Sequence, residues 1–588
     1  MKLPMLNELV TSRDMIDVFK GYNHNLRIGE GEFYDMKNLT STYYPVLSPR
    51  GRRGVYDRSI EPTALIEKDA LCYVDGADFV VNEYRVDMKL STDEADLPKT
   101  LVSMGAYVII MPDKKYVNIE NLEDFGNIEA SFTTTTTVTF EICKVDGLAH
   151  DDIIDGKTAP VLTEAMKKGE EDIPLWLDTS STPHSLKQYS KSSEMWISIA
   201  TTYVKISSPN IGKAFEVNDG VSISGIEDAQ LKDLNNTMVI WAKEDDYIVV
   251  TGIIDKLTSQ TNPITLERTM PNIDFIIESE NRLWGCRYGV ANNGEVVNEI
   301  YASKLGDFKN WNCFMGISTD SYAATVGSDG QFTGAITHLG HPLFFKEKCM
   351  HKVFGNFPSN YQITTTACRG VQKGSHKSLA IVNEVLYYKS RTAICAFDGS
   401  LPKEISYALG DVNYDNAVAC SHANKYYISM REVANDKWHL FVYDTAKGMW
   451  HKEDNARVYE FCSCRGELYY IDDDRYIKTM FGSGEKETRK VEWMAETGII
   501  GTDHPDKKYI SKLNIRMSLE IGSRILVYIQ YDSEDKWDFL FRMEGSSLRT
   551  FTVPIKPKRC DHMKLRIEGE GNAYIYSISK TLEQGSDY

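Results

Sequence analysis

The sequence predicts an all-β protein organised around a β-propeller of about seven blades, because a phrase of short strands, turns and paired aromatic residues recurs along it. The phrase is clearest between residues 271 and 493. Its period of roughly 40 to 50 residues is typical of propeller blades with about four strands each. The anchor groups are Leu283-Trp284, Leu343-Phe344-Phe345, Leu386-Tyr387-Tyr388, Tyr426-Tyr427 and Leu468-Tyr469-Tyr470. The abundance of strand-favouring aromatic residues, 33 Tyr, 22 Phe and 9 Trp, supports the same class.

The length and composition predict a folded chain of several units. At 588 residues the chain exceeds one ordinary core, so we expect about two to four folding units. Its 42% hydrophobic and 26% charged residues are those of a globular protein rather than a disordered one.

Residues 1–49 lack the blade phrase and are predicted to form an extended arm. A short helix ending at Gly21 is expected first. Gly29 and Gly31 permit a tight turn, while Pro45 and Pro49 impose an extended path. A plain N-terminal strand that joins the propeller is the alternative interpretation.

Two blade segments flank a predicted inserted domain. Residues 50–125 carry the first blades, beginning at Gly54, and residues 271–493 carry the rest, which gives about seven blades within a range of six to eight. Residues 126–270 open with a Thr run beside an alternating pattern, contain one short helical pattern, and continue as close-spaced strands. This pattern indicates an inserted β-barrel or sandwich.

Residues 494–588 lose the blade phrase and predict a separate C-terminal β-sandwich. Within the stretch KLNIRMSLEI, alternate residues are apolar, as in a strand with one buried face. The residues expected on that face are Leu513, Ile515, Met517, Leu519 and Ile521.

The charge balance and the cysteines bear on partners and compartment. Lys and Arg total 66 against 84 Asp and Glu, a net charge of −18, and no dense basic stripe for gripping nucleic acid occurs. Solubility explains this balance, and an acidic wall past which DNA slides fits it as well. Eleven Cys residues, scattered and odd in number, predict a protein folded in a reducing cytoplasm. No signal peptide or apolar membrane-spanning run is found.

No sequence motif for nucleotide, zinc-protease or serine-hydrolase chemistry occurs, so neither metal nor cofactor is expected. His338 and His341 form the nearest approach to a metal pair, and turn or rim histidines are the simpler interpretation. Cys462 and Cys464 are two residues apart and so are expected on the same face of a strand, where they are predicted to be buried residues in the core of a blade.

Acidic and serine-containing turns are the remaining candidates. Asp472-Asp473-Asp474 and Glu244-Asp245-Asp246 are predicted to be solvated loop tips, with a Ca²⁺ site as the alternative. The turns at Ser328 (SDGQFTG) and Tyr443 (YDTAKGMW) match the repeated turns of sialidase propellers poorly. With no catalytic, cofactor or metal residue assigned, the chain is predicted not to be an enzyme.

The arm and propeller nevertheless resemble a known family. The stretches GEFYDMKNLTSTYYPVLSPRGRRG and NEIYASKLGDFKNWNCF, followed by STDSYAATVGSDGQFTGAITHLGHPLFFKEKCMHKVFGNFP, are similar to tail stabilisation or nozzle proteins of tailed bacteriophages. The resemblance rests on phrasing and order over the arm and propeller, and does not extend securely to the insertion or the C-terminal sandwich.

The resemblance implies a structural virion protein of the tail, assembled in the cytoplasm of the host bacterium. Copies would form a ring, most plausibly a hexamer, around the DNA-ejection channel and would contact adaptor, tube or fibre proteins. DNA would only pass through, and no membrane insertion is expected.

Two alternatives remain open. One is a carbohydrate- or receptor-binding tail protein, in which Trp537 and Phe539 of the C-terminal sandwich would stack on sugars, although a cross-strand core position is the simpler reading for Trp537. The other, less favoured, is a propeller glycan hydrolase, which would need two carboxylates at the propeller axis.

Overall fold

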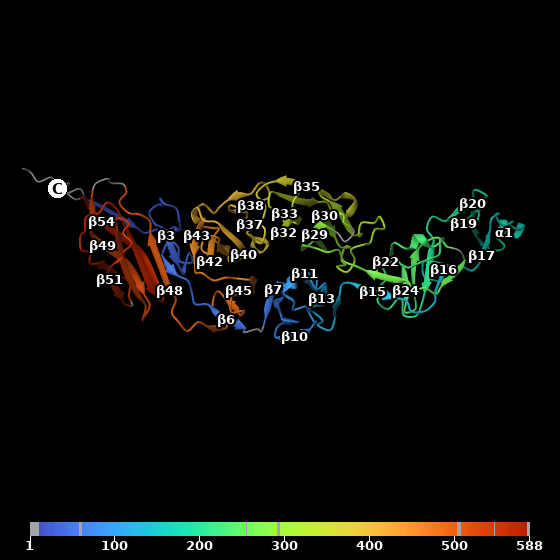
Figure 1. Ribbon diagram of the computed structural model, residues 1–588, viewed down its shortest axis with the longest axis horizontal. Helices are drawn as coiled ribbons and strands as arrows, with labels where there is room; N and C mark the ends of the chain where they lie inside the picture. The colour runs from blue at the N-terminus through green and yellow to red at the C-terminus, as the bar shows by residue number, and fades with distance from the viewer. Residues whose placement is uncertain are drawn as a thin grey trace, which may run out of the picture.

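The computed structural model describes residues 11–57, 61–254, 256–290, 294–502, 507–545 and 547–584. It confirms the predicted class: the molecule is all-β and elongated, with the propeller in the middle (Figure 1). The C-terminal sandwich lies at one end and the inserted domain at the other. The five short helical elements outside these sheets do not alter the layers. They are η1 (Glu94–Asp96), η2 (Lys232–Leu234), η3 (Pro358–Asn360), η4 (His376–Ser378) and η5 (Tyr407–Leu409).

Seven antiparallel units form the propeller, and their inner strands, such as β8 (Ala70–Asp75), β33 (His341–Lys346) and β41 (Lys425–Glu432), are buried on both faces because each blade packs between two others. Blades 1 and 2 are β7 (Pro62–Lys68), β8 (Ala70–Asp75), β9 (Asp78–Val81) and β10 (Tyr84–Asp87), then β11 (Thr100–Met104), β12 (Tyr107–Met111), β13 (Lys115–Asn118) and β14 (Phe125–Asn127). Blades 3 and 4 are β28 (Phe275–Ser279), β29 (Arg282–Val290), β30 (Val296–Ala302) and β31 (Tyr322–Thr325), then β32 (Phe332–His338), β33 (His341–Lys346), β34 (Cys349–Phe354) and β35 (Gln362–Ala367).

The remaining blades close the ring. Blades 5 and 6 are β36 (Ala380–Val382), β37 (Val385–Lys389), β38 (Ile394–Phe397) and β39 (Lys403–Glu404), then β40 (Tyr414–His422), β41 (Lys425–Glu432), β42 (Lys437–Asp444) and β43 (Met449–Lys452). Blade 7 is β44 (Glu460–Cys464), β45 (Glu467–Ile471) and β46 (Ile477–Thr479), completed by β6 (Gly54–Asp57) and β47 (Glu485–Lys486). The first strand of blade 7 packs against the first strands of blades 6 and 1, which closes the circle.

The start of the propeller differs from the sequence prediction. Strand β6 does not begin blade 1 but pairs antiparallel with β46, so that Gly54 faces Thr479 and Asp57 faces Ile477. Blade 1 therefore begins at Pro62. An N-terminal strand in the last blade joins the two ends of the ring by hydrogen bonds, which removes two free sheet edges.

The inserted domain consists of two packed sheets and a smaller sheet at the tip. The packed sheets contain β15 (Ala130–Thr133), β27 (Thr265–Arg268), β22 (Gly220–Ser224) and β23 (Thr237–Val239), opposite β24 (Ala242–Glu244), β25 (Tyr247–Thr251), β21 (Tyr203–Ser207), β16 (Val138–Cys143) and β26 (Leu257–Gln260). The tip carries β17 (Ile153–Gly156), β18 (Leu175–Asp178), β19 (Ser185–Ser190), β20 (Met195–Ser198) and helix α1 (Glu164–Lys168). The helix has only five residues because Gly169, at φ 80°, ends it six residues after its cap Thr163, whose hydroxyl accepts from the Met166 amide.

The sandwich at the other end includes strands from both ends of the chain. One sheet contains β1 (Thr11–Ile16), β54 (Ala573–Gln584), β49 (Lys508–Leu519) and β52 (Arg549–Val553). The facing sheet contains β2 (Gly21–Tyr22), β3 (Glu32–Lys37), β48 (Glu492–Thr497), β53 (Met563–Glu570), β50 (Arg524–Tyr531) and β51 (Asp538–Glu544). The two-stranded pair β4 (Leu39–Thr40) and β5 (Ser48–Pro49) lies between this sandwich and the propeller in sequence.

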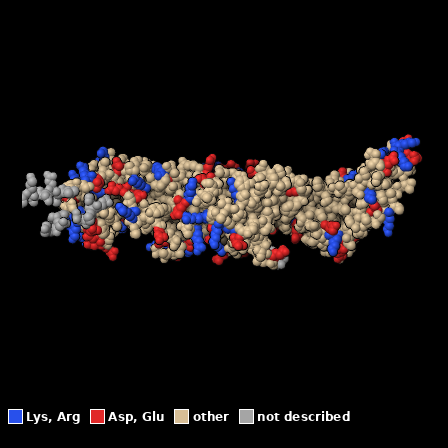
Figure 2. All heavy atoms as spheres, turned by 90° about the horizontal axis from the view of Figure 1, so that it is seen from above, with Lys and Arg blue, Asp and Glu red and all other residues tan. Residues whose placement is uncertain are grey.

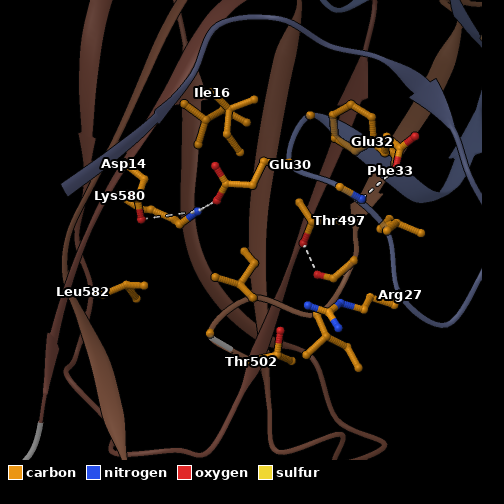
Figure 3. A pocket seen from close by; sticks show the side chains of 18 of the residues that line it. Asp14, Ile16, Arg27, Glu30, Glu32, Phe33, Thr497, Thr502, Lys580 and Leu582 are labelled. Atoms are coloured by element: carbon orange, nitrogen blue, oxygen red, sulfur yellow. Dashed lines mark hydrogen bonds and ion pairs between the residues drawn. The ribbon is translucent and has the colours of Figure 1, made fainter. Parts of the chain in front are cut away.

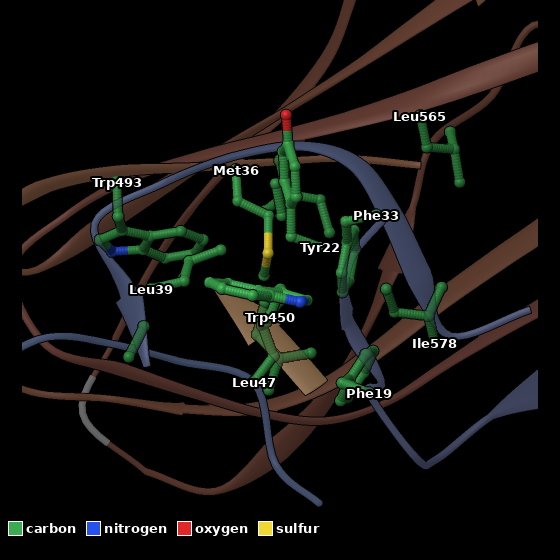
Figure 4. Packing of buried hydrophobic residues seen from close by; sticks show 14 of the residues in the cluster. Phe19, Tyr22, Phe33, Met36, Leu39, Leu47, Trp450, Trp493, Leu565 and Ile578 are labelled. Carbon is green, nitrogen blue, oxygen red and sulfur yellow. The ribbon is translucent and has the colours of Figure 1, made fainter. Parts of the chain in front are cut away.

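The facing sheet continues directly into the propeller. Tyr22 of β2 pairs with Trp450 of β43, so blade 6 and the sandwich sheet form one sheet of ten strands. Their side chains share one core, in which Trp450, Trp493, Phe33 and Phe19 pack together (Figure 4). A hydrogen-bonded sheet with a common core resists bending far better than a linker, so the propeller and the sandwich form one rigid body.

Two expectations for the chain ends are corrected. The helix expected before Gly21 is strand β1, because residues 11–16 alternate in burial and pair with β54. Ile521 does not share the face of Leu513: β49 ends at Leu519, and Ile521 is 90% exposed in the following turn. In both cases the short local pattern fitted two structures, and long-range pairing decided between them.

Figure 2 shows one face of the molecule, on which acidic and basic side chains are interspersed rather than separated. Among the described residues, no helix is long and apolar enough to cross a membrane.

Candidate functional site

Helix η4 contacts the inner strands of several blades of the propeller. Helix η4, in the connection between blades 4 and 5, places the Lys377 ammonium in an ion pair with the Glu460 carboxylate of blade 7. The same ammonium donates to the Tyr459 carbonyl at 3.3 Å. On the other side, the ring of His376 lies 5.3 Å from that of Phe275 in blade 3. Because these contacts join blades 3, 5 and 7, η4 lies near the axis, where propeller enzymes assemble their sites.

Burial controls the protonation of these central groups. It raises the pKa of Glu460, an effect that the nearby Lys377 cation opposes without cancelling. Burial, together with the same cation, lowers the pKa of His376 to about 4, so this imidazole is neutral at pH 7. The Glu460 carboxylate is held in an ion pair with Lys377 despite its burial. Its charged neighbour here is a lysine, whereas glycoside hydrolysis uses a second carboxylate.

A groove lies in the C-terminal sandwich, between the edge of β1 and β54 and the loops around residues 26–32 and 497–502 (Figure 3). Its volume is about 720 Å³. The floor is apolar and includes Phe19, Ile578 and Leu582. This size is within the usual range for a small-molecule or peptide pocket, roughly 300–1,000 Å³.

A charged cluster crosses the mouth of this groove. The ammonium of Lys580, whose side chain is 3% exposed, lies between the carboxylates of Glu30 and Asp14, 3.8 Å from the latter. Glu32 accepts hydrogen bonds from Asn23 at 2.9 Å and from the Gly29 amide at 2.6 Å (Figure 3). Lys580 therefore already has two carboxylate partners, and these contacts join the N-terminal segment to β54.

A row of aromatic and charged side chains crosses the outer face of the sandwich. Tyr528 pairs across strands with Phe539, and their ring centroids lie 5.7 Å apart. The guanidinium of Arg566 lies 4.1 Å from the ring centroid of Trp537 and binds Glu496 at 2.8 Å. Phe539 is 57% exposed, while Trp537 is half-buried. The expectation that Trp537 is a core residue is thus wrong, because it packs on an outward-facing arginine.

The histidines and cysteines singled out from the sequence have structural surroundings. His338 contacts the Glu384 carbonyl at 2.6 Å, and the His341 ring lies 4.8 Å from that of Phe354. Cys462 and Cys464 are both buried in the core between blades 1 and 7. Within the described ranges, no group of three or more His, Cys, Asp or Glu side chains is arranged to hold a metal ion.

The acidic turns are only partly the solvated tips that the sequence predicts. Asp472 is buried, pairs with Lys478, and accepts from the Asp474 amide at 3.1 Å. It fixes a turn, which the alternating pattern around it does not reveal. Glu244, Asp245 and Asp246 are exposed, although Asp246 also accepts from the Asn210 amide at 2.8 Å.

The two turns compared with sialidase motifs also have internal partners. The Ser328 hydroxyl lies 2.7 Å from Nε2 of the buried His351. Beside Tyr443, the buried Asp444 accepts from the Ser41 hydroxyl at 2.5 Å and thereby ties the N-terminal segment to blade 6. Neither turn lies next to the η4 cluster in sequence, and sequence analysis missed Lys377 and Glu460 because nothing marks them within their blade phrases.

Comparison with known proteins shows no family for this chain. No protein-family model and no curated protein matches the sequence. Among solved structures, the propeller domain of the Trilobed protease from Pyrococcus furiosus is similar with a TM-score of 0.25 and 11% identity over 52% of this chain and 90% of that one. An exo-β-1,3-galactanase from Phanerochaete chrysosporium has a TM-score of 0.22 and 10% identity over 52% of this chain and 94% of that one. A sialidase from Trypanosoma rangeli has a TM-score of 0.23 and 8% identity over 67% of this chain and 93% of that one.

The prediction that the chain is not an enzyme is corrected by this comparison. The similar structures include the galactanase, a GH43 glycoside hydrolase and the sialidase. Propeller enzymes collect their active-site residues from several blades, so a search for contiguous motifs does not exclude activity. The identities to these structures are only 8–11%, and the activities in their names are those of the other proteins.

Proposed function

We propose that the protein is a structural component of a bacteriophage tail, of which several copies form a ring around the DNA-ejection path. The ten-stranded sheet that joins blade 6 to the C-terminal sandwich carries the proposal. It joins the propeller to the sandwich, and the inserted domain lies at the opposite end of the elongated molecule (Figure 1), a form suited to spanning between neighbouring tail proteins. The similarity of the arm and propeller segments to tail stabilisation and nozzle proteins also supports a role in the tail.

The contacts of η4 add a constraint to this proposal. Lys377, Glu460 and His376 join several blades near the axis, so DNA would pass through the lumen enclosed by the ring and not through each propeller. The net charge of −18 suits a surface from which DNA is released easily. Adaptor, tube or fibre proteins would contact the inserted domain and the sandwich.

Mass photometry of the purified full-length chain tests this function. We expect an assembly of about 400 kDa if six chains of 66.7 kDa form the ring, and ring-shaped particles by electron microscopy. Cross-linking of virions with mass spectrometry is expected to join this chain to tail proteins. A chain that remains monomeric in solution and also within virions would rule the proposal out.

Glycan binding by the sandwich is a second candidate function, favoured by the outer-face row of the exposed Phe539 and the half-buried Trp537, Tyr528 and Arg566. Flat aromatic rings beside charged hydrogen-bonding groups suit the apolar faces and hydroxyls of sugars. On a glycan array, the wild type is expected to bind a host-surface polysaccharide. The double substitution Trp537→Ala and Phe539→Ala should weaken binding about ten-fold, the effect of roughly 1.4 kcal/mol of lost stacking.

The matched control for that experiment is Phe314→Ala, because Phe314 is 59% exposed and lies on the propeller. It should leave glycan binding unchanged. A blank array with folded wild-type protein, or an equal loss in the control, argues against glycan binding by this face.

A further inference from the structure

Two loops at one end of the C-terminal sandwich bring together a hydroxyl, an imidazole and a carboxylate. The Ser533 hydroxyl oxygen lies 2.6 Å from Nε2 of His562. The other ring nitrogen, Nδ1, lies 2.9 Å from a carboxylate oxygen of Asp561. Ser533 follows β50 and His562 precedes β53, so 29 residues of chain separate the two partners of the first contact.

The order of these contacts has chemical meaning. A carboxylate accepts only from a protonated nitrogen, so Asp561 fixes the neutral imidazole with its hydrogen on Nδ1. Nε2 then has a free lone pair directed at the Ser533 hydroxyl, which is the arrangement of a nucleophile, its base and an orienting group. The hydrogen bond with His562 also lowers the pKa of Asp561, which keeps this carboxylate ionised.

The backbone holds the serine in an unusual conformation. Asp532 and Ser533 have φ angles of 50° and 55°, in the left-handed region that residues with side chains seldom occupy. The Asp532 carboxylate accepts from the amides of Asp561 and His562 at 2.6 and 3.2 Å, and the Asp532 amide donates to the His562 carbonyl at 3.0 Å. These bonds lock the two loops together, and such strain is common where a side chain must point in a set direction.

The hydroxyl is accessible to a reactant. Ser533 and Asp561 are exposed, and the side chain of His562 is 21% exposed. The ammonium of Lys558 is adjacent, 3.2 Å from Glu534 and 4.9 Å from the ring centroid of Tyr531. An open site of this kind fits a small acyl group on an extended carrier better than a ligand that requires an enclosed pocket.

We propose that Ser533, His562 and Asp561 form a serine-hydrolase-type triad that acts on short acyl esters. The Ser533 oxygen forms a bond to the acyl carbon while its proton passes to Nε2 of His562. The ester C–O bond breaks, and the leaving alcohol takes that proton. Water then attacks the acyl-serine and gives one proton to Nε2, which returns it to the serine oxygen, so that one ester and one water yield an acid and an alcohol.

A second serine in the same chain provides an internal comparison. Ser328 also contacts a histidine, but His351 is buried and its second nitrogen lies 2.9 Å from the Thr365 hydroxyl rather than from a carboxylate. Ser400 is an exposed serine whose hydroxyl donates to Asp398 at 2.5 Å and has no histidine contact in the structure. Of these three serines, Ser533 alone is exposed and also contacts an imidazole that a carboxylate orients.

Labelling of the intact protein with a fluorophosphonate probe, with adduct mapping by mass spectrometry, tests the proposal. We expect an adduct on Ser533 that forms at least ten-fold faster than on Ser328 or Ser400. His562→Gln should reduce the Ser533 rate ten-fold or more, and Asp561→Asn should reduce it less. Ser533→Gly removes the hydroxyl and suits the left-handed backbone, so this folded variant should lose both the adduct and hydrolysis of p-nitrophenyl acetate.

The outcomes separate a nucleophile from hydrogen bonds that merely tie the loops. Fast labelling that depends on His562 supports the triad. Labelling of Ser533 no faster than that of Ser400, or unchanged in folded His562→Gln, overturns it. Both results are independent of whether the chain assembles into rings.

Discussion

Replacement of Arg53 by methionine is expected to lower the free energy of unfolding of the propeller by about 3–5 kcal/mol. The Arg53 guanidinium is 4% exposed and contacts Asp454 at 2.7 Å and Glu453 at 2.8 Å. Methionine has a similar volume but leaves both carboxylates without this partner in a site that excludes water. Arg50, whose nearest contact to the pair is 3.6 Å, cannot replace it fully.

Hydrogen exchange followed by mass spectrometry measures this loss at β6, the strand directly after Arg53. Faster exchange of β6 and β46 is expected before any change in the inserted domain. Lys37→Met is the control, since Lys37 and its partner Glu492 are 50% and 76% exposed, and loss of such a pair costs less than about 1 kcal/mol. Equal exchange of β6 in both variants would contradict the assigned role of Arg53.

The effect of Arg53→Met should depend on pH. Burial alone would raise the pKa of Asp454, but Arg53 and then Arg50 bring it below its ordinary value. A lowered pKa in the folded state adds stability above the unfolded pKa, which is lost only as the pH falls through the folded value, below about pH 4. Without Arg53 the carboxyl groups can take up protons, so the penalty should be smaller at pH 4 than at pH 7.

Trp450→Ala is expected to destabilise the junction of propeller and sandwich by about 3–5 kcal/mol. The Trp450 side chain is 2% exposed in the shared core (Figure 4), and its indole nitrogen donates to the Ile405 carbonyl at 2.8 Å. Alanine leaves a large cavity and an unpaired carbonyl. Because β43 and β2 belong to one sheet, blade 6 and the sandwich should lose protection from exchange together.

Trp241→Ala is the matched control for Trp450→Ala. Trp241 is 37% exposed in the inserted domain, so its loss should cost less than about 1 kcal/mol and leave β43 protected. If Trp450→Ala alters blade 6 but leaves the sandwich strands unaffected, the two parts are not energetically coupled through their common sheet.

The features that sequence analysis predicts well are those made by neighbouring residues. Each blade is a meander of adjacent strands, so the alternation around pairs such as Tyr426-Tyr427 is enough to indicate it. The closure by β6 escaped prediction because its partner strand lies more than four hundred residues away. The helix predicted at β1 is wrong for the same reason, because these six residues form a strand only by pairing with β54.

The candidate sites depend on the fold in a stronger way. Lys377 lies in the connection between blades 4 and 5 and Glu460 lies in blade 7, and the two meet only because the propeller is circular. Asp561-His562 carries no recognisable motif until the turn at Ser533 is placed opposite it. The outward orientation of Trp537 becomes evident only from its contact with Arg566 on β53, which β50 separates from β51 in the sheet. Local patterns identify strands, whereas sites arise from the pairing of distant strands.

The pairing of β1 with β54 and of β6 with β46 has a consequence for synthesis on the ribosome. Residues 11–16 are translated more than five hundred residues before their partners, residues 578–583. At about 5–20 residues per second, the N-terminal strand waits roughly half a minute to two minutes for its partner. Blades can fold as they emerge, but the ring cannot close before β46 has emerged and the sandwich cannot close before β54 has emerged. A chain that terminates earlier retains unpaired strand edges that invite aggregation.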